Sequence, residues 1–126
     1  MNAEKNQLHF LFRKPKLPVI VCIDQDITAV KTLQKLANIL LDLKIIEASK
    51  IIIIDLTGEE FWFNYEHSVL SPGFAYKKWT KKKIIEIYNR GHKEEQMTYS
   101  TASISNKRFD KLIIEICDLL LARDEV

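Results

Sequence analysis

Two uninterrupted apolar runs predict the buried strands of a sheet. Residues 17–24 read LPVIVCID and residues 50–58 read KIIIIDLTG, and neither run alternates with polar positions. A strand that is covered on both faces has this pattern. Residues 59–65, EEFWFNY, alternate instead, so we expect a third strand that a tight turn at Thr57–Gly58 pairs with the second.

Apolar positions at helical spacing predict three helices. The first covers residues 26–43, and its stripe is Val30, Leu33, Ala37, Leu40 and Leu41. The second begins after Thr80 and stops at Gly91, a residue type that often ends helices. The third is capped by Ser105, and its core stripe is Phe109, Leu112, Ile113, Ile116 and Leu120. Ile114 and Leu121 lie off that stripe, either under a neighbouring element or against another chain.

The order of these elements predicts a single α/β (α+β) domain over residues 1–126. We expect a mixed sheet of three to four strands with about three packed helices, and a right-handed crossover in the first β-α-β unit. Residues 1–16 are an edge strand or an arm, and residues 94–105 are a candidate fourth strand. The Ser71–Gly73 segment breaks the chain between elements.

Composition is that of an ordinary globular domain. Apolar residues make up 47% and charged residues 29%, and the formal net charge of +2 is too small to indicate nucleic-acid binding. Cys22 and Cys117 lie in apolar runs, which predicts buried free thiols. No run approaches the ~18 apolar residues of a membrane span, and the N-terminus lacks a signal-peptide core, so we expect a cytoplasmic protein.

The basic residues are concentrated before the second helix. Residues 71–126 carry 11 basic and 8 acidic side chains, and five of the basic ones are lysines between Lys77 and Lys83. A helix N-terminus is itself partly positive, so lysines in its first turn are unfavourable there. Two interpretations remain open: the lysines form a solvated face, or they bind a phosphate or a carboxylate-rich surface.

Aromatic residues alternate with these lysines, which suits two kinds of partner. Single-stranded nucleic acid would stack on the rings, whereas a protein partner would use Tyr76 and Trp79 as anchors. The region has no arginine before Arg90 and has glutamates nearby, which favours the protein. The candidate partner-binding residues are Tyr76, Lys77, Lys78, Trp79, Lys81, Lys82, Glu59, Glu60 and Glu66.

One acidic motif suggests phosphate chemistry as a third hypothesis. Asp24, Asp26 and Thr28 follow an apolar strand and resemble the Asp-x-Asp-x-Thr signature of haloacid dehalogenase-like phosphatases, in which such carboxylates bind Mg²⁺. Thr57 resembles the phosphate-binding hydroxyl of that family. The chain departs from the family because its late acidic residues lie on a helix. As an alternative to phosphate chemistry, Asp24 or Asp26 could be present as the N-cap of a helix, which explains the same residues.

Other catalytic patterns are missing from the sequence. His9, His67 and His92 are scattered, and no spacing typical of a zinc site joins them to each other or to cysteine. There is no Gly-rich phosphate loop and no nucleophile-elbow motif. We therefore expect a protein that is not an enzyme and that uses no cofactor or metal.

Residues 51–89 resemble small bacterial immunity proteins of contact-dependent growth-inhibition systems. The similar features are a compact α/β design, abundant lysine and isoleucine, and an aromatic SPGF…KKW segment. The resemblance implies a protein that binds a toxin domain and neutralises it. A cationic toxin would face Glu59, Glu60, Glu66 and the Asp24–Asp26 edge, whereas an acidic toxin would face the lysines; both alternatives stay open here, as does the oligomeric state.

Overall fold

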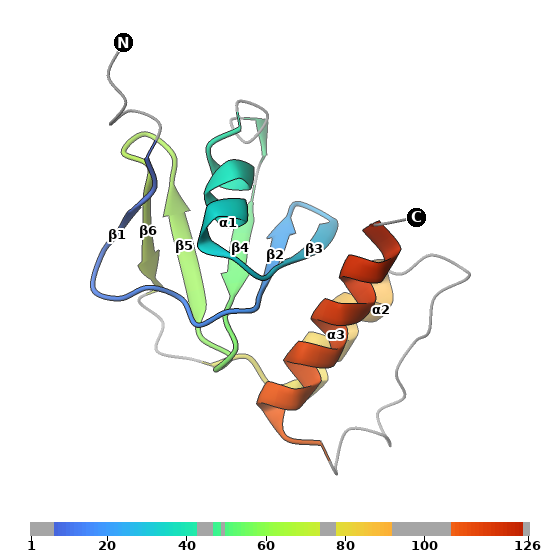
Figure 1. Ribbon diagram of the computed structural model, residues 1–126. Helices are drawn as coiled ribbons and strands as arrows, with labels where there is room; N and C mark the ends of the chain where they lie inside the picture. Colours follow the sequence, from blue (N-terminus) through green and yellow to red (C-terminus); the bar gives the residue numbers. More distant parts are fainter. Residues whose placement is uncertain (1–6, 43–46, 49, 74–77, 92–106, 125–126) are drawn as a thin grey trace.

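The computed structural model describes residues 7–42, 47–48, 50–73, 78–91 and 107–124. Within these ranges, a mixed sheet lies between one helix on one face and a pair of helices on the other (Figure 1). The predicted α+β class is confirmed. The sheet has six strands, however, and not the three to four that were predicted.

The sheet is antiparallel except at one edge. Its strands follow the order β1-β6-β5-β4-β2-β3, and only β1 and β6 run parallel. The strands are β1 (His9–Phe10), β2 (Val19–Ile23), β3 (Asp26–Val30), β4 (Ile51–Ile54), β5 (Glu60–Asn64) and β6 (Val69–Pro72). β1 is the edge strand expected within residues 1–16, and β5 pairs with β4 as predicted.

The first predicted helix begins later than expected, because residues 26–30 form strand β3. This strand folds back on β2 with Ile23 opposite Asp26, and its β-branched residues favour an extended chain. Helix α1 (Leu33–Leu40) starts only after Thr32, whose hydroxyl accepts a hydrogen bond from the Lys35 amide at 3.1 Å. The prediction of a helix from residue 26, capped by one of the aspartates, is therefore wrong.

The connection through α1 also differs from the predicted β-α-β unit. β2 and β4, the two apolar strands, are antiparallel neighbours, with Ile20 opposite Ile54. Because β2 is antiparallel to β3 as well, the chain passes from β3 through α1 to a parallel β4 on the far side of β2. The expected crossover between parallel first and second strands is wrong, since a hairpin intervenes.

Strand β6 includes Ser71 and Pro72 of the segment that the sequence predicts to be a break in the chain. Pro72 is its last residue and lies opposite Phe61, and the Gly73 amide donates to the Glu60 carbonyl at 2.9 Å. Proline is tolerated there because the Gly73 amide, and not the Pro72 nitrogen, makes the hydrogen bond to β5. The candidate strand at residues 94–105, including Ser105, lies outside the described residues.

The core is divided by the sheet into two apolar clusters. On one face, Leu36 and Leu40 of α1 pack against β-strand residues that include Phe61. On the other, α2 (Lys81–Gly91) and α3 (Phe109–Asp124) pack on residues that include Ile20 and Ile54. Both faces of β2 and β4 are covered, which explains their uninterrupted apolar runs. No helix in the described part of the chain combines the length and apolar character needed to cross a bilayer.

The third helix matches its predicted stripe. The stripe residues Leu112, Ile113, Ile116 and Leu120 are all buried. The two residues off the stripe behave differently, since Leu121 packs at the edge of the core and Ile114 is 41% exposed.

Candidate partner-binding surface

Two tryptophans are fixed by one carboxylate at the start of β5. Glu60 accepts a hydrogen bond from the Trp79 indole at 2.9 Å through Oε1, and another from the Trp62 indole through Oε2. Trp62 lies against Gly73, where an added Cβ would come within 2.8 Å of the ring. Trp62 is nevertheless 39% exposed. The result is a rigid aromatic pair at the surface, which is the kind of side chain that dominates protein interfaces.

The helix with lysines in its first turn forms as predicted. The Thr80 hydroxyl accepts from the Lys83 amide at 3.2 Å, which caps α2. Lys82 and Lys83 are exposed, while Lys81 is half-buried and its ammonium donates to the Lys107 carbonyl at 2.6 Å. The unfavourable charge of Lys81 is thus offset by a carbonyl oxygen, whereas Lys82 and Lys83 project toward solvent.

The contact between Lys81 and Lys107 places the beginnings of α2 and α3 side by side (Figure 1). Two helix N-termini and their basic residues therefore share one end of the molecule, here called the basic end. Its described members are Lys78, Lys81, Lys82, Lys83, Lys107 and Arg108. Lys107 also pairs with Glu115, and Arg108 with Asp110 at 3.4 Å.

Sequence reasoning missed Lys107 and Arg108 as members of this surface. They stand in the sequence as a basic pair just before the last helix, but 24 residues separate Lys107 from Lys83. No local pattern indicates that two such helices run in the same direction with their first turns in contact. Of the predicted residues, Tyr76 and Lys77 lie outside the described residues, while Lys78 is exposed and Trp79 partly buried.

The three candidate glutamates do not form one acidic patch. Glu59 accepts a bidentate hydrogen bond from the Arg13 guanidinium, with Nε to Oε1 at 2.8 Å, and Glu60 accepts from the two tryptophans. Glu66 is exposed in the turn between β5 and β6, at the other end of strand β5. The carboxylates near the lysines therefore bind groups within the molecule.

The Asp24–Asp26 motif occupies a hairpin turn and not a strand-to-helix junction. Asp24 has φ 53°, a conformation that aspartate tolerates better than most residues. Its Oδ1 accepts from the Lys50 amide at 2.9 Å, and its own amide donates to the Lys50 carbonyl at 2.8 Å. These contacts pin the turn to the start of β4, and they explain the aspartate without phosphate chemistry.

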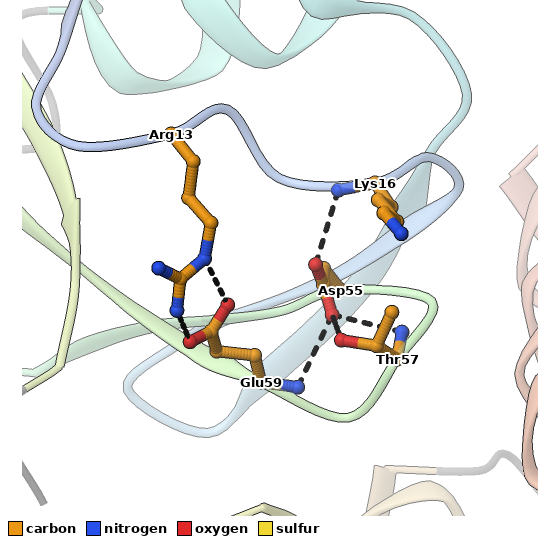
Figure 2. Close-up of polar contacts among 5 residues, drawn as sticks. All are labelled: Arg13, Lys16, Asp55, Thr57 and Glu59. Carbon is orange, nitrogen blue, oxygen red and sulfur yellow. Dashed lines mark hydrogen bonds and ion pairs between the residues drawn. The ribbon is translucent and has the colours of Figure 1, made fainter. Parts of the chain in front are cut away.

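Asp55 and Thr57 are likewise engaged in the fold (Figure 2). Asp55 is 2% exposed, and its Oδ1 accepts from the Thr57 hydroxyl at 2.6 Å and from the Glu59 amide at 3.1 Å. Its Oδ2 accepts from the Lys16 amide at 3.1 Å. This carboxylate therefore organises the turn between β4 and β5, as a buried acceptor must be satisfied. The Thr57 hydroxyl, which was suggested as a phosphate ligand, therefore donates its hydrogen bond to Asp55.

A pocket of about 540 Å³ lies between the β2–β3 hairpin and α2. It is lined by Cys22, Asp24, Gln25, Asp26, Ile27, Lys50, Ile52, Trp79, Ile87 and Arg90. Burial raises the pKa of the Cys22 thiol to about 11, and the cationic Arg90 only partly opposes this. Because the thiolate is the reactive form, Cys22 is a poor nucleophile at neutral pH.

Cys117 and the histidines add no reactive cluster to the described part of the chain. Both cysteines are free; Cys117 is buried, and burial raises its pKa to about 12. His9 and His67 are exposed, and His92 lies outside the described residues. Nowhere in the described ranges do three His, Cys, Asp or Glu side chains come together as metal ligands.

The chain matches no protein-family model, no curated protein and no solved structure. Its function is therefore inferred from the contacts, charges and exposure of its own residues. The basic end and the tryptophan pair beside it are the surface features that the internal contacts do not explain.

Proposed function

We propose that this protein is a protein-binding domain whose partner presents an acidic surface. The observation that carries the proposal is the convergence of two lysine- and arginine-bearing helix starts next to tryptophans held by Glu60. An interface of this kind places rigid aromatic anchors in the centre and charged groups at the rim, where they steer association and select the partner.

The contacts of the acidic residues favour a partner that is acidic and not cationic. Glu59 is paired with Arg13, Glu60 is bound to both tryptophans, and Asp24 is bound to the Lys50 backbone. A cationic partner would compete with these internal donors for the same carboxylates. Lys82 and Lys83 are exposed on a helix end whose own field also attracts anions, so an acidic partner meets no such competition.

Within this class, we propose an immunity protein that binds a toxin domain in the cytoplasm and neutralises it. The support is the resemblance of residues 51–89 to such proteins, together with a surface suited to tight protein binding. In this proposal the acidic surface belongs to the toxin, and the complex blocks its active site or a surface essential to its action.

A pull-down from the lysate of the native host tests the proposal. The wild-type chain is the bait, with nuclease and high salt present, and we expect one stoichiometric protein to be retained. In a second pull-down with nuclease at low salt, a bait with Lys82→Glu and Lys83→Glu should retain it about tenfold less, because the rim charge is reversed and salt does not screen it. A matched bait with Lys31→Glu and Lys35→Glu has the same net charge and should retain it normally, since neither of these exposed lysines belongs to the basic end.

Neutralisation is then measured by expressing the retained protein in a sensitive strain with and without this chain. Rescue of growth by the wild type, and not by the Lys82→Glu, Lys83→Glu variant, is the expected result. A retained protein that is harmless when expressed alone contradicts the immunity function and leaves a protein-binding domain. A bait that retains no protein contradicts the proposal as a whole.

The alternative function is binding of single-stranded nucleic acid, which the convergence of lysines with Arg108 also favours. Its signature is material that nuclease removes and an affinity that falls steeply with salt, because each phosphate contact releases counterions. An interface anchored by tryptophans loses much less affinity over the same range of salt. Arg108 is the only arginine among the described residues of the basic end, and arginine is the better phosphate ligand, so the nucleic-acid alternative is the weaker one.

A further inference from the structure

The loop after β1 has a backbone held by hydrogen bonds, and it exposes two neighbouring apolar side chains. Leu11 is 51% exposed and Phe12 is 82% exposed. Phe12 has φ 69°, and the Arg13 amide donates to the Leu11 carbonyl at 2.8 Å, so the three residues form a γ-turn with Phe12 at its centre. The phenylalanine is therefore the most prominent point of this turn.

This turn is unfavourable on two counts for an isolated protein. A γ-turn with positive φ is rare and strained for any residue except glycine, and phenylalanine is among the least suited to it. A largely exposed aromatic ring also gains almost nothing from the core. Strain of this kind persists where the surrounding structure imposes it, and it is concentrated at sites of binding or catalysis.

Contacts on both sides hold the turn in place. Before it, the Leu11 amide donates to the Leu70 carbonyl of β6 at 3.0 Å. After it, the Arg13 guanidinium binds the Glu59 carboxylate, and the Lys16 backbone amide donates to the Asp55 carboxylate. Residues 13–16 therefore lie across the β4–β5 turn (Figure 2). The backbone at Phe12 is thus held in one conformation, and a partner that binds the ring has little backbone ordering left to do.

The turn is continuous with the surface that we propose for partner binding. Glu59, which holds Arg13, is paired with Lys78 of the basic end through a β-bridge. Lys16 and Arg108 line one hollow of about 490 Å³ between the β4–β5 turn and the start of α3. Lys14 and Lys16 are exposed beside the turn, so the charge around Phe12 has the same sign as the basic end.

We infer that Phe12, flanked by Leu11, is an anchor that inserts into an apolar pocket of the partner protein, and that carboxylates on the rim of this pocket face Lys14 and Lys16. The inference rests on the proposed function and assigns to the same interface a residue outside the lysine-rich segment. A backbone held in a strained turn favours a protein over a membrane, because a fluid bilayer accepts an apolar side chain from any backbone conformation and gains nothing from the strained turn.

The test titrates purified variants against the protein that the wild-type bait retains in nuclease-treated lysate at high salt. Phe12→Ala and Phe12→Gly should each raise the dissociation constant at least about tenfold, as loss of an interface anchor does. Tyr65→Ala is the matched control, because Tyr65 is an aromatic residue that is 50% exposed in the β5–β6 turn. Its dissociation constant should stay within about twofold of the wild type.

Folding is checked on the same samples. Phe12→Gly should unfold at a temperature no lower than the wild type, since glycine relieves the positive φ, so weaker binding by this variant reflects the missing ring. Binding to a membrane, the alternative to a protein partner, is measured by sedimentation of each variant with vesicles of phosphatidylcholine and phosphatidylglycerol.

The outcomes separate the two proposals. Retention of a partner whose affinity is unchanged by Phe12→Ala and Phe12→Gly overturns the anchor and leaves the proposed function intact. Phe12-dependent binding to the vesicles, without an effect on the partner protein, also overturns it. A wild-type bait that retains no protein overturns the proposed function and the anchor together. Weakened partner binding by both Phe12 variants, with Tyr65→Ala unaffected, supports the anchor.

Discussion

Glu60 illustrates how much of this protein's surface is decided at the level of single residues. In the sequence it is the second of two adjacent glutamates, with nothing to distinguish it from Glu59. In the structure one of them binds Arg13 and the other binds Trp62 and Trp79. A carboxylate accepts several hydrogen bonds at once, so a single side chain can fix two aromatic rings. Both glutamates are therefore already engaged by donors within the molecule.

Cys22 is one of two buried thiols for which the structure predicts a pH dependence. Burial raises its pKa from 9.0 to about 11, so the folded protein favours the protonated thiol. The stabilising effect of that preference is complete below pH 9 and is lost as the pH rises from 9 to about 11. At pH 9, the native thiol should react with a disulfide reagent about fiftyfold more slowly than in the unfolded chain, because about half of the unfolded thiol and about one hundredth of the native thiol is ionised.

The reaction is followed by absorbance, with the Cys22→Ser variant subtracted to remove the contribution of Cys117. The rate for native Cys22 should continue to rise between pH 9 and about 11, well beyond the range in which the unfolded chain levels off. A native rate that already levels off near pH 9 would show that the pocket does not disfavour the thiolate.

At the scale of elements, the three lysines in the first turn of α2 have different surroundings. The three residues are identical in type and adjacent in sequence, yet Lys81 donates to the Lys107 carbonyl while Lys82 and Lys83 are exposed. The conflict between lysine and the helix dipole therefore persists at Lys82 and Lys83. That conflict is small in energy, which is why a helix can carry such a surface.

Replacing Lys82 and Lys83 by glutamate should stabilise the isolated protein. Each change places a negative charge at a positive helix end, worth roughly 0.3–1 kcal/mol in the free energy of unfolding at low salt. Lys81→Glu should instead destabilise it, because the Lys107 carbonyl loses its ammonium donor and faces a carboxylate. Urea denaturation at low and high salt measures both effects, and the gain at Lys82 and Lys83 should shrink with salt. Equal changes at all three positions would contradict the contact with Lys107.

At the scale of the whole molecule, the β4–β5 turn connects the sheet to the helix pair. Gly58 in this turn has φ 87° and lies against Phe109 at the start of α3, and its carbonyl accepts from the Trp79 amide at 2.8 Å. Asp55 and Arg13 hold the same turn from the other side, through Glu59. The tryptophan pair, the basic end and the Phe12 turn therefore share one structural junction.

Gly58→Ala should destabilise the protein by about 2–4 kcal/mol, because alanine is strained at positive φ and its Cβ would lie 2.9 Å from the Phe109 ring. Thermal and urea unfolding measure the loss. Phe109→Leu removes part of the clash, so the double variant should lose less than the sum of the two single losses. Strict additivity would show that Gly58 and Phe109 do not interact.

Much of the fold could be predicted because its causes are local. The strands β2, β4 and β5, the helix that begins after Thr80 and the buried stripe of α3 all follow from apolar periodicity and capping. The predictions failed at β3 and β6. Residues 26–30 have spacings that suit either a strand or a helix, and only pairing with β2 decides between them. Pro72 reads as a breaker unless its place opposite Phe61 is known.

The sequence by itself determined most of the elements, the cluster of lysines and the aromatic residues among them, since each depends on neighbours a few positions away. Tertiary structure alone decided which charges are used internally, that Lys107 and Arg108 join Lys81, and that Phe12 projects from a strained turn. These properties depend on contacts between residues far apart in the chain. Periodicity and composition carry no information about such contacts, so the partner-binding surface emerges only when the sheet and helices are assembled.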